Sequence, residues 1–359
     1  MSTVFLIEKS DFSGNIFVMT YTYASSYISG FGTAVEAILK TQIPDVTIIK
    51  HLDGLIIYKT KLAFAGQKLS CMNNTYQVVA MAKTDPTNPY EIALKKFVNQ
   101  TGLDLTGISD NVNIVPKQSF KILPFDGNSP TSINFDIVKP VEQEIQRKLK
   151  LNIGLKRHNF DVVLSRRSEG LFLLLFKLTY NRVTEKDLPH GALRPELCNI
   201  MSWISDIKPN DIILDPFCGH GSIPRELAKH FKYNMLFASD IDAGLVNKFK
   251  NEFKKNKKNL FIKQRDALNL EYFENGFFDK IITDPPWNSY NSKDEDFTVF
   301  YEKMLLGFYR ILKPTGACTI LMGNVKDFEK ALGTSGFKLQ EKYHVLVNGK
   351  KANVYKLVK

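Results

Sequence analysis

Runs of consecutive apolar residues dominate the pattern of the second half of the chain. From Asp211 onward, short apolar runs recur at intervals that leave room for a helix between them. Because successive residues of a strand point to opposite faces, a run without polar interruptions predicts a strand buried on both faces. Such strands, alternating strictly with helices, predict an α/β fold with a doubly wound, Rossmann-like sheet over residues 181–359. The predicted strands are 212–214, 235–238, 260–262, 281–282 and 318–321.

An antiparallel hairpin is predicted at the end of this sheet. Two strand-like runs, 343–347 and 353–357, flank the dipeptide Asn348-Gly349. The Asn-Gly pair favours the type I′ turn, which needs positive φ at both central residues and matches the twist of the strands. We therefore expect a C-terminal antiparallel hairpin to complete the sheet.

The first half of the chain mixes strand-like runs and helical stretches at shorter intervals. Its strands are predicted from β-branched and aromatic residues. A stretch with two prolines among small polar residues, 83–90, predicts a linker. We therefore predict two α+β domains, 1–84 and 85–180, before the carboxyl-terminal domain. The predicted strands are 4–7, 46–50, 55–58, 76–81, 119–123, 161–165 and 171–176, and the predicted helices are 33–39, 91–100 and 138–149.

The composition adds a basic charge to this picture. The 359 residues carry a formal net charge of +11 and a pI near 9.2. Such an excess of cations favours polyanionic partners, because each phosphate contact releases counterions. A lysine-rich surface that is only solvated is the alternative interpretation.

The cysteines argue against two kinds of small scaffold. Cys71, Cys198, Cys218 and Cys318 are scattered and form no C-x-x-C pair. This spacing is typical neither of a zinc site nor of a disulfide framework, and it fits a reducing compartment. The apolar runs are too short to span a bilayer, and no basic stretch leads into a long apolar segment at the start. We expect a monomeric cytoplasmic protein without metal or membrane attachment.

A glycine turn follows the first predicted strand of the Rossmann-like region. Asp215 precedes Gly219 and Gly221, and a helical segment follows them. Glycines allow a backbone to approach a ligand closely. The third glycine of the dinucleotide fingerprint is missing, and an acid before the turn would repel a pyrophosphate. The acid suits a cationic amino-acid group, so the turn predicts S-adenosylmethionine rather than the competing nicotinamide cofactor.

Acids also follow the next three predicted strands. Asp240 lies about 20 residues after the glycines, where an acid can bind ribose hydroxyls. Asp266 follows the third strand and can contact an adenine edge, and Asp284 follows the fourth. Because ligands bind outside the carboxyl ends of parallel strands, we expect these side chains to line one site. Taken alone, Asp266 is equally consistent with a helix cap.

The residues Asp284-Pro285-Pro286-Trp287 suit the binding of a flat ring that carries an amino group. The Asp carboxylate and the Pro285 carbonyl can accept hydrogen bonds from an exocyclic amine. The prolines fix φ and carry no N–H, so the turn is stiff, and Trp287 offers a stacking face. We expect these four residues to form the catalytic site. Taken alone, they are also typical of a turn followed by a half-buried Trp.

These motifs resemble those of the THUMP-linked tRNA guanine-N2 methyltransferases, which belong to the amino-methyltransferases with an Asp/Asn-Pro-Pro-aromatic motif. Three stretches carry the resemblance: 191–197 (Gly-Ala-Leu-Arg-Pro-Glu-Leu), 215–223 (Asp-Pro-Phe-Cys-Gly-His-Gly-Ser-Ile) and 284–287. The resemblance covers about 160–336. It implies a class I methyltransferase domain that binds S-adenosylmethionine, preceded by a ferredoxin-like and a THUMP-like module.

The motifs and the resemblance together name candidate binding residues. For the cofactor they are Arg194, Pro195, Asp215, Phe217, Gly219, Gly221, Ser222, Asp240, Ile241, Asp266 and Ala267. THUMP modules grip the acceptor end of tRNA in this family, which implies RNA contacts by the basic cluster Arg147, Lys148, Lys150, Lys156, Arg157, Arg166 and Arg167. A solvated charged face is the alternative for this cluster. His220 stands where relatives usually have Ser, and Asn288 where they often have Gly.

The expected reaction is direct methyl transfer to the exocyclic amine of a base, and the resemblance implies guanine N2 of tRNA. Hydrogen bonds to Asp284 and to the Pro285 carbonyl favour the pyramidal nitrogen that attack requires. The base must leave its stack, and Trp287 would stack against it. Two other functions stay open: an amino-methyltransferase of adenine N6 or cytosine N4 in DNA or rRNA, and a catalytically silent RNA-binding scaffold.

Overall fold

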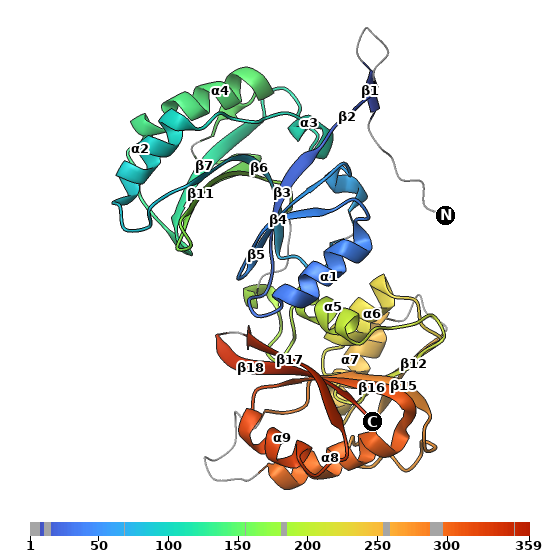
Figure 1. Ribbon diagram of the computed structural model, residues 1–359. Helices are drawn as coiled ribbons and strands as arrows, with labels where there is room; N and C mark the ends of the chain where they lie inside the picture. The colour runs from blue at the N-terminus through green and yellow to red at the C-terminus, as the bar shows by residue number, and fades with distance from the viewer. Residues whose placement is uncertain are drawn as a thin grey trace. The chain divides into compact units, whose positions relative to one another are not determined.

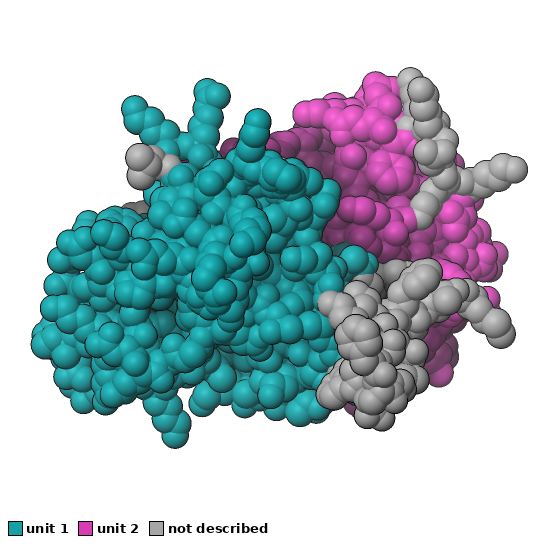
Figure 2. All heavy atoms as spheres, turned by 90° about the horizontal axis from the view of Figure 1, so that it is seen from above, with its two compact units in different colours: residues 1–27, 39–182 teal, residues 28–38, 183–359 magenta. Residues whose placement is uncertain are grey.

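The computed structural model describes residues 8–10, 16–67, 69–154, 156–180, 185–253, 259–287, 297–347 and 349–359. The chain forms two compact units, which Figure 2 distinguishes by colour. The first consists of residues 1–27 and 39–182, and the second of residues 28–38 and 183–359. The strand expected at 4–7 lies outside the described residues, as do Asn288 and Asn348.

The second unit is built on one seven-stranded sheet (Figure 1). Its strand order is β14-β13-β12-β15-β16-β18-β17, and neighbours from β14 to β16 are parallel. β18 pairs antiparallel with both β16 and β17, which confirms the mixed Rossmann-like sheet and its hairpin. The strands are β12 (Ile212–Asp215), β13 (Met235–Asp240), β14 (Leu260–Gln264), β15 (Phe278–Thr283), β16 (Leu312–Met322), β17 (Lys338–Val347) and β18 (Lys350–Val358).

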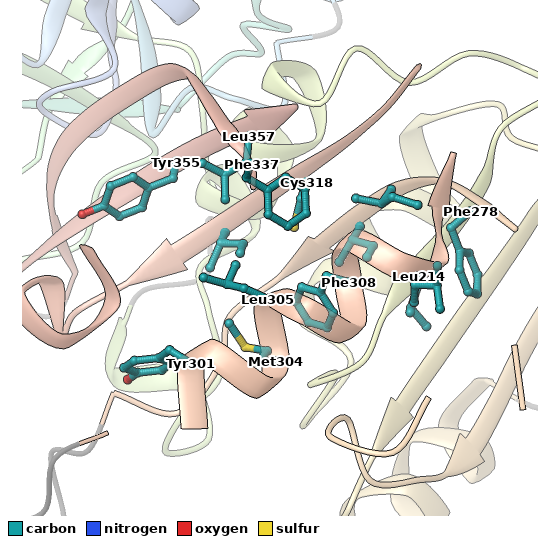
Figure 3. Packing of buried hydrophobic residues seen from close by; sticks show 14 of the residues in the cluster. Leu214, Phe278, Tyr301, Met304, Leu305, Phe308, Cys318, Phe337, Tyr355 and Leu357 are labelled. Carbon is teal, nitrogen blue, oxygen red and sulfur yellow. The ribbon is translucent and has the colours of Figure 1, made fainter. Parts of the chain in front are cut away.

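Five helices of the second unit flank this sheet within the described residues. They are α5 (Pro195–Ile204), α6 (Ser222–His230), α7 (Ala243–Phe253), α8 (Thr298–Ile311) and α9 (Val325–Leu332). In α8, Tyr301, Met304, Leu305 and Phe308 recur at helical spacing and are fully buried. They pack with strand residues in the core cluster of Figure 3. Burial of each of these side chains stabilises the fold by about 2 kcal/mol and anchors α8 against the sheet.

The prediction that strands and helices alternate strictly is wrong at one connection of the second unit. No helix joins β14 to β15, and residues 265–277 form turns instead. Phe273 and Phe277 of this segment pack edge-on against Phe237 and Phe278 of the neighbouring strands. The segment therefore covers the sheet with aromatic side chains in place of a helix.

The first unit is built on a nine-stranded sheet. Eight strands follow the order β4-β5-β3-β6-β11-β10-β7-β8, and β9 pairs with β7. The strands are β3 (Tyr21–Ser26), β4 (Thr47–Leu52), β5 (Leu55–Thr60), β6 (Asn74–Lys83), β7 (Ser119–Asp126), β8 (Ser129–Pro130), β9 (Asn152–Ile153), β10 (Phe160–Arg167) and β11 (Leu171–Lys177). A separate small sheet pairs β1 (Glu8–Ser10) with β2 (Ile16–Val18). The helices described before α5 are α1 (Gly32–Gln42), α2 (Tyr90–Gln100), α3 (Ile108–Asn111) and α4 (Lys139–Leu149).

This sheet continues across residue 84. β6 pairs with β11 along most of its length, so strands from 1–84 and from 85–180 share one ladder. α2 packs on β11 through Phe97, whose ring stacks on Phe172 at 4.8 Å between centroids. The division of this region into ferredoxin-like and THUMP-like domains at 84 stays a prediction. In the described part of the chain, no helix is both long and apolar enough to cross a membrane.

Candidate cofactor and catalytic site

The site begins at the point where the strand order of the second unit reverses. β12 and β15 are neighbours and run parallel, with Leu214 opposite Ile281. Their carboxyl ends are joined by a hydrogen bond of 2.7 Å, which Thr283 Oγ1 donates to Asp215 Oδ1. Ligands of doubly wound sheets bind in the crevice beside such a point. Asp215 therefore lies where the sequence predicts it, and Thr283 fixes its carboxylate.

Asp215 is a buried acid whose described hydrogen-bond partners are neutral. Only 1% of its surface is exposed, and Thr283 Oγ1 and the Phe217 N–H donate to its Oδ1. Its pKa is raised to about 8, mainly by burial; the two hydrogen bonds partly offset this rise, and the carboxylates of Asp240 and Asp284 add to it. A cation bound beside Asp215 would stabilise its ionised form.

The glycine turn is held from two sides. The Gly219 N–H donates to Asp240 Oδ2 at 2.8 Å, which links the ends of β12 and β13. Gly221 has φ of +78°, and a Cβ atom there would lie 2.5 Å from the Phe249 ring of α7. No larger residue fits this turn without moving α7, because both the backbone conformation and the packing exclude a side chain.

The segment upstream of α5 reaches the same turn. The Leu193 N–H donates to Ser222 Oγ at 3.1 Å. Ser222, which is predicted to bind the cofactor, therefore joins the 191–197 motif to the start of α6. Arg194 precedes α5, and its Nε lies 3.5 Å from Glu196 Oε2. Pro195 is the first residue of α5, where a missing N–H costs nothing.

The ends of β13 and β14 combine acids with exposed apolar side chains. Asp266 Oδ1 accepts a hydrogen bond of 2.9 Å from the Leu268 N–H, while Ala267 is buried. Ile241, directly after Asp240, is 68% exposed. The Arg265 N–H donates to the Asp240 carbonyl at 3.0 Å and keeps the two strand ends together. An exposed aliphatic face beside two acids suits a nucleoside, whose ring is flat and whose sugar carries hydroxyls.

The Asp284–Trp287 loop bonds to itself. Trp287 Nε1 donates to Asp284 Oδ1 at 2.7 Å. Burial raises the pKa of Asp284 to about 7, and the hydrogen bond from Trp287 partly offsets this rise. Pro285 is buried, and the carbonyl of Pro286 accepts a hydrogen bond from the Tyr301 hydroxyl. The predicted stacking of Trp287 on a base stays a prediction; its indole is half-buried.

The basic residues predicted to bind RNA differ in their surroundings. Arg166 donates to Asp126 at 2.5 and 2.8 Å, and its guanidinium lies 5.2 Å from the Tyr90 ring centroid. Arg167 donates to Glu169, and Arg147 and Lys148 both pair with Glu144 on α4. Lys156 and Arg157 are exposed. Arg166 therefore already has internal hydrogen-bond partners for its guanidinium, whereas Lys156 and Arg157 extend into solvent.

Sequence reasoning missed three residues that hold the site. Thr283 fixes Asp215, Tyr301 fixes the Pro286 carbonyl, and Gly323 leaves room for the Trp287 ring. Tyr301 and Gly323 lie outside every motif, and their roles depend on packing between distant segments. Among the described residues, no group of three His, Cys, Asp or Glu side chains could hold a metal ion.

Three comparisons place this site among known proteins. Residues 182–353 match the RMKL-like methyltransferase domain family. The tRNA (guanine(6)-N(2))-methyltransferase THUMP3 of Mus musculus is 30% identical over 220 residues, which are 55% of this chain and 43% of that protein. The chain thus matches less than half the length of this relative. The tRNA (guanine(6)-N2)-methyltransferase of Methanocaldococcus jannaschii is 23% identical over 294 residues, covering 68% and 77% of the two chains.

Several solved structures resemble nearly the whole chain. TrmN from Thermus thermophilus superposes with a TM-score of 0.72 at 19% sequence identity, covering 95% of this chain and 100% of that one. At this identity the likeness establishes the fold, including an α+β region before the Rossmann-like sheet. It confirms the predicted fold class.

Proposed function

We propose that the chain methylates guanine N2 in tRNA with S-adenosylmethionine, and the match of residues 182–353 to the RMKL-like methyltransferase domain family supports this proposal. The tRNA guanine-N2 methyltransferases among its relatives support this substrate. The observation that carries the proposal is the convergence of Asp215, Asp240 and Asp284 at neighbouring strand ends, next to a rigid Asp-Pro-Pro-Trp loop.

The residues of the site fit the cofactor's chemistry. When bound, S-adenosylmethionine supplies an electrophilic methyl group on a cationic sulfur. The buried Asp215 carboxylate has no charged hydrogen-bond donor among the described residues. A cationic ligand would therefore stabilise its ionised form and lower its raised pKa. Ile241 and Asp266 then flank an adenine, and Asp240 offers its carboxylate to the ribose.

The catalytic loop holds the amine. Guanine N2 donates hydrogen bonds to Asp284 and to the Pro285 carbonyl, which localises the nitrogen lone pair for attack on the methyl carbon. The new C–N bond forms as the S–C bond breaks, and the electron pair stays on sulfur. Asp284 takes the proton that the methylated nitrogen loses, because a carboxyl with a pKa of about 7 can accept and release protons near neutral pH.

RNA binding is proposed for the exposed cations of the first unit. Lys150, Lys156 and Arg157 are the best candidates among the predicted cluster because they are exposed, whereas the exposed Arg147 and Lys148 pair with Glu144. Each phosphate that such a side chain neutralises adds salt-dependent affinity. Arg166, with its described hydrogen bonds to Asp126 and Asn88, serves the fold first.

The decisive experiment identifies the modified nucleoside. The protein is incubated with methyl-labelled S-adenosylmethionine and, in separate reactions, total tRNA, total rRNA and DNA, and the products are digested to nucleosides. We expect N2-methylguanosine from tRNA, and about 10²- to 10³-fold less of it from a parallel reaction with Asp284→Ala. Label in N6-methyladenine or N4-methylcytosine would instead establish an adenine or cytosine enzyme. No label in any nucleic acid, with intact cofactor binding, would support the silent scaffold.

A further inference from the structure

The junction that follows β16 lies against the catalytic loop. β15 and β16 run parallel, with Thr283 opposite Ile320, so the residues after each strand are neighbours. A Cβ atom built on Gly323 would lie 2.1 Å from Cε3 and 2.4 Å from Cδ2 of Trp287. Real Cβ atoms do not approach so closely, because the overlap is strongly repulsive. The indole therefore occupies the space that any other residue at 323 would fill.

A second contact to the loop comes from α8. The Tyr301 hydroxyl donates to the Pro286 carbonyl at 2.7 Å, and its ring is fully buried at the edge of the core cluster (Figure 3). Burial raises the pKa of Tyr301, and the Asn324 side chain lies close enough to the Tyr301 hydroxyl to lower it in part. Asn324 is itself fixed, because it caps α9 and donates to Asp327 Oδ2 at 2.8 Å. The Asp284–Trp287 loop is thus contacted by two elements, at Trp287 by Gly323 after β16 and at Pro286 by Tyr301 of α8.

These contacts determine which oxygens of the loop remain for a substrate. Tyr301 uses the Pro286 carbonyl as an acceptor, and the Trp287 indole N–H uses Asp284 Oδ1. The Pro285 carbonyl and Asp284 Oδ2 are then the acceptors that an incoming amine can use. A shift of the indole would remove the donor of Asp284 Oδ1 and leave the carboxylate free to rotate.

We propose that Tyr301 and Gly323 are positioning residues, which clamp the Asp284–Trp287 loop so that Asp284 Oδ2 and the Pro285 carbonyl face one exocyclic amine. This inference rests on the proposed function for its effect on turnover. Its effect on the loop itself is independent of any substrate and can be measured without RNA.

The first test compares two glycines. Gly323→Ala costs no backbone strain, because Gly323 is outside the left-handed region, but its methyl group must displace the indole. Gly333→Ala is the matched control: Gly333 has φ of −57°, and a Cβ there meets only two carbonyl oxygens at 3.4 and 3.7 Å. We expect Gly323→Ala to lower kcat for tRNA methylation about 10²-fold, as misplacement by about 1 Å does, with unchanged S-adenosylhomocysteine affinity.

The second test separates positioning from simple destabilisation. In a Trp203→Phe background, Trp287 is the one remaining tryptophan of the sequence and reports on the loop by fluorescence. Gly323→Ala should change its emission and lower the melting temperature, and the temperature effect should vanish when Trp287 is also Ala. If Gly323→Ala lowered the melting temperature equally in the presence of Trp287 and in a Trp287→Ala background, the proposed clamp would be overturned.

The third test removes single hydroxyls from one helix. Tyr301→Phe should lower kcat about tenfold with little change in KM, since one buried hydrogen bond is lost. Tyr309→Phe, on the same helix with its ring packed on Phe337, should leave both constants unchanged. Unchanged kcat in Tyr301→Phe would remove Tyr301 from the clamp. If the unmodified protein methylates no nucleic acid, the proposed function fails, while the fluorescence and melting tests still decide the clamp.

Discussion

Acids of the two units are stabilised in opposite ways. In the first unit, Arg166 donates two hydrogen bonds to Asp126 and lowers the pKa of this half-exposed carboxyl. In the second unit, Asp215 and Asp284 are surrounded by neutral donors, Thr283 and Trp287 among them, and burial raises their pKa values to about 8 and about 7. If Asp215 and Asp284 contributed only to stability, we would expect each to have a cationic partner, as Asp126 has in Arg166.

The difference distinguishes structural from functional charge. A carboxylate with a bidentate guanidinium partner has its charge compensated, and it gains little from a ligand. A buried carboxyl near two other acids keeps its proton at neutral pH, and a bound cation would favour its ionised form. In the second unit, Asp215 and Asp284 are therefore acids whose charge a cationic ligand would stabilise, whereas Arg166 and Asp126 hold two strands of the first unit together.

Removing one acid from each unit should give opposite results. We expect Asp284→Ala to lower methyl transfer about 10²- to 10³-fold, because a hydrogen-bond acceptor of the reacting amine is lost. Its apoprotein should melt at the same or a higher temperature, since a buried charge disappears. Asp126→Ala should keep the turnover per folded molecule and melt at a lower temperature. Substantial turnover in Asp284→Ala would remove this residue from the catalytic site.

The apoprotein should lose stability as the pH rises through the neutral range. The folded pKa of Asp215, about 8, exceeds the ordinary value of 3.8, so between these values the unfolded chain is ionised while the folded carboxyl keeps its proton. The stabilising contribution is complete below about pH 4 and is lost as the pH approaches 8. Melting curves from pH 5 to 9 check this. Asp215→Asn should flatten the profile, and an unflattened profile would assign the effect elsewhere.

A smaller effect is expected when Arg166 is replaced. Arg166→Gln should lower the free energy of unfolding by about 2 kcal/mol, because Asp126 loses a charged donor. Urea titration gives this value, with Arg157→Gln as the exposed control. If Arg166→Gln left stability unchanged and weakened tRNA binding, its charge would belong to the RNA interface, and the contrast between the two units would fail there.

The smallest effect concerns the exposed cation Arg157. Arg157→Gln should leave the melting curve unchanged and reduce the slope of log affinity for tRNA against log salt by about 1, if the side chain contacts one phosphate. Filter binding at several salt concentrations measures the slope. An unchanged slope would exclude Arg157 from the RNA contacts and favour a solvated face.

The sequence predicted the parts of this protein that follow from local pattern. The apolar runs of β12 and β15 located two strands, and the rule that ligands bind at carboxyl strand ends located Asp215 and Asp284. β3 escaped prediction because its sequence, Tyr-Thr-Tyr-Ala-Ser-Ser, lacks an apolar run, although it pairs with β5 and β6 inside the sheet.

Long-range packing accounts for the rest. The helix expected between β14 and β15 is replaced by turns whose Phe273 and Phe277 pack onto the sheet, which no period of three or four residues indicates. Tyr301 and Gly323 contact the Asp284–Trp287 loop from 15 and 36 residues beyond Pro286 and Trp287. Neither residue type is unusual in a helix or after a strand, so only the contact itself reveals the role.

The position of β18 between β16 and β17 constrains the order in which the protein can be assembled during translation. β17 leaves the ribosome before β18, yet in the finished sheet β17 pairs only with β18 among the described strands. At about 5 to 20 residues per second, the β17 edge stays without its partner for a fraction of a second or longer. The sheet that carries Asp284 therefore closes only after synthesis has passed residue 358.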